Sequence, residues 1–166
     1  MFQHLLHEES IDLHFEAPNR EAALAGMIAL LPSRDLGPKQ KAKLLELLLQ
    51  RENLGTTALG DGFALPHGVL PGLSEPIASL AMSRKGIAYP SLDGAPVQLI
   101  LLTVFPEGAD FLAKRYLVIH ESENIFRDPF IRQRLQHCES REDVYGLLLQ
   151  ESSSVKQSLR FASLNA

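Results

Sequence analysis

The sequence has no tryptophan and a single cysteine, Cys138. One thiol cannot form a disulfide within the chain, so a hydrophobic core has to hold the fold together. Apolar runs such as 97–105 are far shorter than the roughly 20 residues that cross a bilayer. The first ten residues, MFQHLLHEES, also lack the basic and apolar parts of a secretory signal. We therefore expect a soluble cytoplasmic protein.

Clusters of lysine and arginine are missing as well. The 166 residues carry a formal net charge of -4. Because a nucleic-acid binder needs a basic face to neutralise phosphates, we expect no nucleic-acid partner. The hydrophobic share of 45% and the charged share of 22% are close to those of globular proteins, which excludes disorder. Small phosphorylated ligands and protein partners remain as candidates.

The hydrophobic pattern predicts one α/β sandwich, because helical and strand periods alternate along the chain. Asn19 can cap one helix, and Ser140 with Asp143 resembles a capping box at the start of another. We expect strands near 11–15, 63–67, 77–82 and 97–104, and helices over 22–31, 38–52, 111–126, 129–137 and 140–149.

Two segments, 38–52 and 151–166, have an unusual composition. The helix 38–52 is rich in leucine and too apolar for a one-sided surface helix, so we expect it in the core. Residues 151–166 are polar and serine-rich, which predicts a C-terminal tail that is either disordered or an accessory helix. The domain itself is expected to cover residues 1–150.

His67 is the residue that points to chemistry, because it ends a short predicted strand and follows a glycine-rich loop at 53–62. An imidazole with a pKa of about 6.5 is neutral at physiological pH and can attack phosphorus. Such a reaction needs a cation and hydrogen-bond donors for the phosphoryl oxygens. Arg51, at the end of the leucine-rich helix, offers a planar fork of donors, and Thr56 and Thr57 offer hydroxyl or N–H groups.

Each of these residues also has an ordinary structural explanation. His67 could be a hydrogen-bonded histidine at a strand end, and Arg51 a last-turn cation that complements the helix dipole. Thr56 and Thr57 could cap the loop. Residue types and spacing alone therefore leave both interpretations open.

The stretch RENLGTTALGDGFALPHG, residues 51–68, closely resembles the signature of the fructose/mannitol-type (type 2) enzyme IIA domains of the bacterial phosphotransferase system. This family includes nitrogen-regulatory members. In its pattern, Arg-Glu is followed by a Gly/Thr loop and a Gly-x-Ala-x-Pro-His segment. The resemblance continues through VLPGLSEPIASLAMSRKGIAY and LDGAPVQLILLTVFP and covers residues 10–150. It implies a single-domain sandwich with a mixed β-sheet flanked by helices.

The resemblance also implies a function. His67 would accept a phosphoryl group at its Nε2 (tele) atom from a histidine phosphocarrier protein, and Arg51 would steady the phosphate. The group would then pass to a IIB-type partner, so that the chain meets the membrane only through IIB or IIC components. The alternative is a regulatory module whose affinity for a target changes when His67 is phosphorylated. Neither interpretation involves a metal or an organic cofactor.

One position departs from the family pattern. The family usually has a second histidine, followed by leucine, at the start of the helix after the fourth strand. Counting back from Asp128 places Arg115 there, whereas counting forward from Pro106 places Ala113 there. Arg115 could bind the phosphate or could be an ordinary solvated surface arginine. His120 lies five residues past Arg115 and is expected to face another direction.

Overall fold

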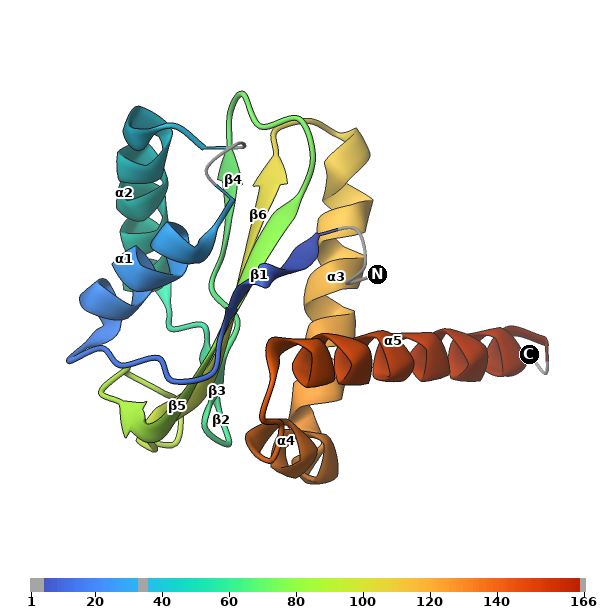
Figure 1. Ribbon diagram of the computed structural model, residues 1–166. Helices are drawn as coiled ribbons and strands as arrows, with labels where there is room; N and C mark the ends of the chain where they lie inside the picture. The colour runs from blue at the N-terminus through green and yellow to red at the C-terminus, as the bar shows by residue number, and fades with distance from the viewer. Residues whose placement is uncertain (1–4, 33–35, 165–166) are drawn as a thin grey trace.

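The computed structural model describes residues 5–32 and 36–164, with side chains described through residue 152. Its sheet lies between two layers of helices (Figure 1). The strands are β1 (Leu6–Asp12), β2 (Ala58–Gly60), β3 (Phe63–Ala64), β4 (His67–Leu70), β5 (Ile77–Ile87) and β6 (Val97–Pro106). The helices are α1 (Arg20–Leu30), α2 (Pro38–Leu54), α3 (Asp110–Arg127), α4 (Pro129–Gln136) and α5 (Arg141–Leu164).

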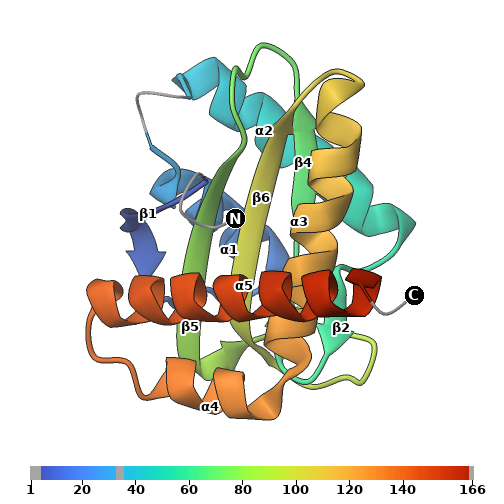
Figure 2. The same ribbon diagram turned by 90° about the vertical axis from the view of Figure 1, so that its right-hand side faces the viewer.

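The sheet is mixed, as predicted. Its strand order is β1-β5-β6-β3-β2, and β4 also pairs with β6. The central strands β5 and β6 are antiparallel, whereas β1 runs parallel to β5, and both β3 and β4 run parallel to β6. Helices α1 and α2 cover one face, and α3 and α5 cross the other face (Figure 2). The fold is therefore the expected α/β sandwich.

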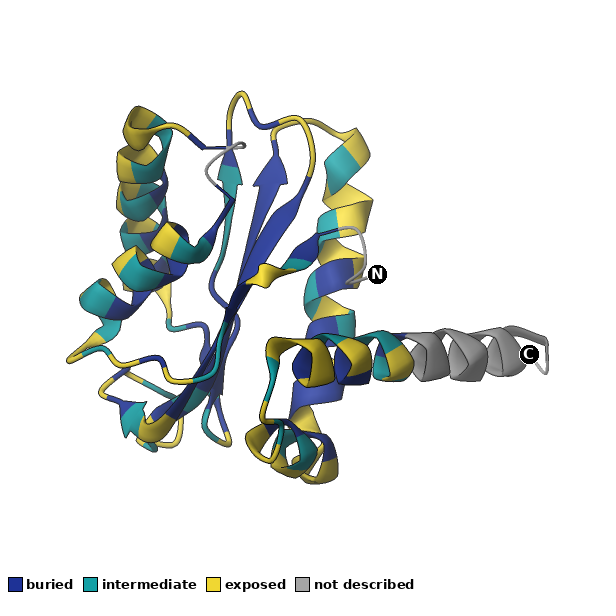
Figure 3. Ribbon diagram, viewed as in Figure 1, coloured by how far each residue is buried: buried dark blue, intermediate teal, exposed yellow. Residues whose placement is uncertain are grey.

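The central strands bury both of their faces, which explains the nearly continuous apolar sequence of β6 (Figure 3). Alternate side chains of β6 enter opposite layers, because successive residues of a strand point to opposite faces. Ile100, Leu102 and Val104 pack with α1 and α2. Leu99 and Leu101 pack with α3 and α5.

Local signals at the helix starts are confirmed. The Asn19 side chain accepts a hydrogen bond from the Ala22 N–H at 2.9 Å, which caps α1. The Asp143 N–H donates to Ser140 Oγ at 3.0 Å, and the Ser140 N–H donates back to Asp143 Oδ2 at 3.1 Å. This reciprocal pair is a capping box in which aspartate takes the place of glutamate.

Other expectations need correction. The first strand spans Leu6–Asp12 and not 11–15, because pairing with β5 places Leu6 opposite Ala78. The region expected as one strand at 63–67 is divided into β3 and β4, since Pro66 has no N–H for a sheet ladder. In addition, three residues of the predicted 53–62 loop form β2.

Helix α2 is less central than predicted. Leu44 and Leu48 are buried, whereas Leu45, Leu47 and Leu49 are only partly buried against the same cluster. The helix therefore lies on the sheet with one buried face, and its other leucines remain close to solvent.

Helix α5 continues to Leu164, beyond residue 149, where we expected it to end. The backbone of the predicted tail is thus helical as far as the structure describes it, while the domain boundary at residue 150 stays a prediction. Among the described residues, none of the helices is both long and apolar enough to span a membrane.

Candidate functional site

His67 is the first residue of β4 and pairs in register with Thr103 of β6. Residues in register on neighbouring strands point to the same face, and Thr103 lies between two residues that face α1 and α2. His67 therefore points to the opposite face, which α3 covers. The next residue, Gly68, faces α2 so closely that an added Cβ would lie 3.2 Å from Leu48 Cδ2.

The ring of His67 is held in one orientation. Its Nδ1 lies 3.0 Å from the carbonyl oxygen of Leu65. Because a carbonyl oxygen can only accept, Nδ1 carries the proton in this bond, and Nε2 keeps its lone pair. The residue is half-buried.

The surroundings keep this ring neutral. Burial lowers the pKa of His67, and the positive charges of Arg51 and Arg115 lower it further. The Leu65 carbonyl and the negative charge of Glu52 act in the opposite direction on the same pKa. The net effect is a pKa below the ordinary 6.5, so that the nucleophilic form prevails at neutral pH.

Arg51 has the structural role that the sequence offered, whereas phosphate binding by its guanidinium stays a prediction. It lies in the last turn of α2, and its Nη1 donates to the Gly55 carbonyl oxygen at 2.9 Å. It thereby satisfies a carbonyl at the helix end, as a last-turn cation does. Its positive charge also lowers the pKa of His67.

Arg115 reaches the site from the first half of α3. It is half-buried and lines a hollow of about 250 Å³ together with Val69 of β4 and Phe105 of β6. Its positive charge lowers the pKa of His67, whereas the choice between Arg115 and Ala113 as the matching position stays a prediction. His120 is exposed and stacks on Tyr116 with ring centroids 6.0 Å apart, so it contacts its own helix.

The two threonines are engaged within the loop. The Thr57 hydroxyl donates to Glu52 Oε1, and the Thr57 N–H donates to Glu52 Oε2 at 3.2 Å. The Thr56 hydroxyl donates to the Pro90 carbonyl oxygen and accepts from the Ala58 N–H. For either hydroxyl to donate to a phosphate, these bonds would have to rearrange. In this structure both side chains therefore support the loop that leads to His67.

Sequence reasoning missed Glu52, which is 3% exposed and holds Thr57 with both carboxylate oxygens. Its burial was readable, because Leu44, Leu48 and Glu52 recur every four residues on one face of α2. Tyr89 is buried near this carboxylate, and burial together with the charge of Glu52 raises the pKa of its phenol. The bonds between Glu52 and Thr57 hold the loop against the end of α2, where Arg51 also lies.

The site thus presents an imidazole whose Nδ1 is hydrogen-bonded and whose pKa is lowered by the charges of two guanidinium groups. Such groups can form charge-assisted hydrogen bonds to phosphoryl oxygens, and arginine can do so with two parallel bonds. In the part of the chain that the structure describes, no three His, Cys, Asp or Glu side chains gather as a metal site.

Several known proteins are similar to this chain. The model of a family described as "Phosphoenolpyruvate-dependent sugar phosphotransferase system, EIIA 2" matches residues 4–151. The nitrogen regulatory protein of Bradyrhizobium diazoefficiens is 36% identical over 114 residues, which cover 69% of this chain and 73% of that protein. The fructose-specific EIIABC component of Bacillus subtilis is 27% identical over 147 residues. That match covers 88% of this chain but only 22% of the longer protein.

Solved structures with the same fold are also similar to this chain. The crystal structure of nitrogen regulatory protein IIA-Ntr from Neisseria meningitidis has a TM-score of 0.79 and 28% identity, with coverage of 87% of this chain and 96% of that one. The complex of mannitol enzyme IIA with phosphorylated mannitol enzyme IIB from Escherichia coli gives a TM-score of 0.67 at 20% identity. This match covers 88% of this chain and 99% of that one, and it shows that the two share a fold. With the family model spanning nearly the whole sandwich, the chain belongs to the type 2 enzyme IIA family of the phosphotransferase system.

Proposed function

We propose that Nε2 of His67 accepts a phosphoryl group from a histidine phosphocarrier protein. The observation that carries this proposal is the bond from Nδ1 to the Leu65 carbonyl, which leaves Nε2 unprotonated beside Arg51 and Arg115. A neutral ring with a fixed tautomer is ready for attack without prior loss of a proton.

The transfer exchanges one nitrogen–phosphorus bond for another. The Nε2 lone pair attacks the phosphorus in line, and the bond to the donor histidine breaks as the bond to His67 forms. Negative charge on the phosphoryl oxygens is stabilised by the positive charges of Arg51, whose Nη1 is held by the Gly55 carbonyl oxygen, and Arg115. The chain then holds the group as a phosphohistidine.

The surface beside the site suits a docking protein. On α3, Leu112 and Tyr116 are 58% and 70% exposed, and both lie next to Arg115 along the helix. Apolar and aromatic side chains of this kind are typical of protein interfaces. The phosphoryl donor and a later acceptor would use this same surface in turn, in the cytoplasm or at the membrane through a IIB or IIC component.

The destination of the phosphoryl group has two candidates. One is a cysteine of a IIB-type partner, since the E. coli mannitol enzyme IIA of the same fold forms a complex with phosphorylated IIB. The other is a regulatory use, in which the added charge changes affinity for a target protein. The nitrogen regulatory relative, at 36% identity, favours the second candidate.

The test of acceptance is a phosphorylation assay. Purified chain is incubated with phosphoenolpyruvate and the general phosphotransferase proteins, and its intact mass is recorded. We expect wild type and His120→Ala to gain one acid-labile phosphoryl group, and His67→Ala to gain none. A folded wild type that gains nothing, or a His67→Ala variant that still gains the group, would contradict the proposal.

The destination is tested with the phosphorylated protein. Mixing it with a purified IIB domain measures whether the group leaves His67, and affinity capture with phosphorylated and unphosphorylated chain measures whether partner choice changes. Loss of the group to IIB supports the carrier role. A phosphate that stays while partner binding changes supports the regulatory role.

A further inference from the structure

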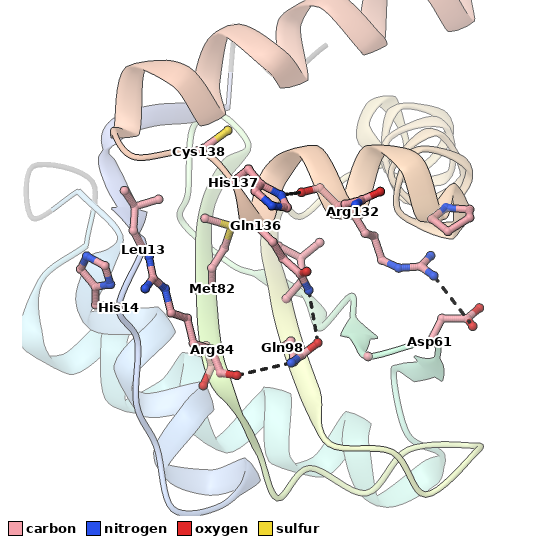
Figure 4. Close-up of a pocket in the computed structure, with 15 residues that line it drawn as sticks. Leu13, His14, Asp61, Met82, Arg84, Gln98, Arg132, Gln136, His137 and Cys138 are labelled. Atoms are coloured by element: carbon pink, nitrogen blue, oxygen red, sulfur yellow. Dashed lines mark hydrogen bonds and ion pairs between the residues drawn. The ribbon is translucent and has the colours of Figure 1, made fainter.

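A second cavity, shown in Figure 4, is lined by Met82 of β5, Gln98 of β6 and Gln136 of α4, and His67 is not among its lining residues. It has a volume of about 530 Å³, within the range of small-molecule sites. Its floor includes Gln98, whereas His67 is in register with Thr103 of the same strand. Five residues of extended strand separate the two positions by about 17 Å. The cavity is therefore distinct from the phosphorylation site.

The wall of the cavity is apolar on one part and rich in amide groups on another. Leu13, Met82 and Leu99 supply the apolar part. The Gln136 side chain of α4 donates to Gln98 Oε1 at 3.3 Å, which links α4 to the sheet across the cavity. This combination of apolar surface and a few polar groups is typical of sites for small organic molecules.

Positive charge stands on two sides of the cavity. Figure 4 shows Arg84 beside Leu13 and His14 on one side, and Arg132 with Asp61 on the other. Arg132 has structural partners: its Nη2 lies 3.9 Å from Asp61 Oδ1, and its Nη1 donates to the Phe126 carbonyl oxygen at 2.5 Å. Its charge is therefore largely compensated.

Arg84 differs from Arg132 in this respect. Among the described residues its guanidinium has no acidic partner, although the next residue, Lys85, pairs with Glu16 at 2.7 Å. The backbone of Arg84 is anchored, because its carbonyl oxygen accepts from Gln98 Nε2 at 3.4 Å. The Arg84 side chain itself is exposed, and an arginine that lines a cavity without an acidic partner can pair with a carboxylate or phosphate.

We propose that this cavity binds a small organic anion. Arg84 pairs with the anionic group, the amides of Gln98 and Gln136 hydrogen-bond to polar atoms, and the apolar wall contacts the rest of the molecule. The inference does not depend on the role of His67. A ligand bound at this site would act on the chain independently of phosphorylation.

The test uses the full chain labelled with ¹⁵N, titrated separately with adenosine monophosphate, succinate and inorganic phosphate, with amide shifts recorded by NMR. We expect saturable shifts at Met82, Gln98 and Gln136 with an organic probe. Stronger binding of adenosine monophosphate would indicate a phosphate ligand, and stronger binding of succinate a carboxylate ligand.

Variants assign the binding to the cavity. We expect Arg84→Gln to weaken binding about tenfold, the loss typical of one charge-assisted hydrogen bond. Gln136→Glu should also weaken it, because a carboxylate there repels the anion. Lys85→Gln is the matched control and should leave the affinity unchanged, since Lys85 pairs with Glu16 outside the cavity.

Three results would overturn the inference. The first is the absence of saturable shifts with both organic probes at millimolar concentrations. The second is inorganic phosphate binding as tightly as either organic probe, which would indicate nonspecific attraction of anions. The third is equal weakening by Arg84→Gln and Lys85→Gln in variants that unfold at the same temperature as wild type.

Discussion

Replacing Arg115 with glutamine tests the electrostatics of the His67 site most directly. The change removes one of the two positive charges that act on His67 and keeps a side chain of similar length. A hydrogen bond to a charged group contributes about 1.5–3 kcal/mol. Since Arg51 remains beside the ring, we expect a loss near the lower value, which corresponds to about a tenfold smaller equilibrium constant for phosphoryl transfer onto His67.

The same substitution should change the pH dependence of acceptance. Arg115 lowers the pKa of His67, so its removal raises that pKa toward the ordinary value. The loss of activity on acidification should then begin at higher pH in Arg115→Gln than in wild type. A merely structural role of Arg115 would not produce this shift.

The assay mixes phosphorylated histidine phosphocarrier protein with each variant and measures the phosphorylated fraction at equilibrium by intact mass, across a range of pH. Arg127→Gln is the matched control, because Arg127 pairs with Glu123 at the far end of the same helix. Equal equilibrium constants and pH profiles for the two variants would refute the role assigned to Arg115.

Three further outcomes concern stability. Because the pKa of His67 is below its ordinary 6.5, the unfolded chain binds this proton more readily, and the free energy of unfolding should fall as pH drops below 6.5. Urea unfolding above and below that pH should show a smaller fall in His67→Gln. Leu48→Ala, at a position 1% exposed, should cost about 2–5 kcal/mol, against less than about 0.5 kcal/mol for Leu54→Ala at 87% exposed. Ser140→Ala should cost about 1 kcal/mol through the lost cap of α5, measured as a lower urea midpoint.

Signals that depend on near neighbours could be read from the sequence. Asn19 caps α1 and Ser140 caps α5 through bonds that span three residues. The apolar run at 97–104 likewise predicted a strand, and β6 forms there. In each case the physical cause lies within a few residues, so the pattern alone contains it.

Features that depend on distant partners were harder to predict. The alternation at Ile11, Leu13 and Phe15 indicated a strand, yet the pairing of β1 with β5 begins at Leu6. The Phe15 N–H still donates to the Met82 carbonyl oxygen at 2.9 Å, so the alternation marked a real contact with β5 beyond the strand. Register is set by the partner strand and by burial against α5, which local sequence does not specify.

In the candidate site, too, residues within one continuous motif could be predicted, and those that depend on distant packing were harder to predict. The Arg51-to-His67 segment identified the ring and one cation, because both belong to a continuous motif. Arg115 is 48 positions from His67, and only the packing of α3 on the sheet brings its charge to the ring. Glu52 was missed because its carboxylate is engaged by Thr57, a bond that requires the loop to fold back on α2.

An arginine at position 115 has a consequence for the direction of phosphoryl flow. Its guanidinium stays charged at every physiological pH and offers no lone pair, whereas a histidine can lose its proton. Under the proposed function, two permanent cations would stabilise the phosphorylated dianion on His67 as a ground state, and stabilising a ground state raises the barrier to onward transfer unless the transition state gains equally. We therefore expect a phosphohistidine of this chain to transfer its group slowly to a IIB domain, which would suit the regulatory role proposed above better than rapid transfer.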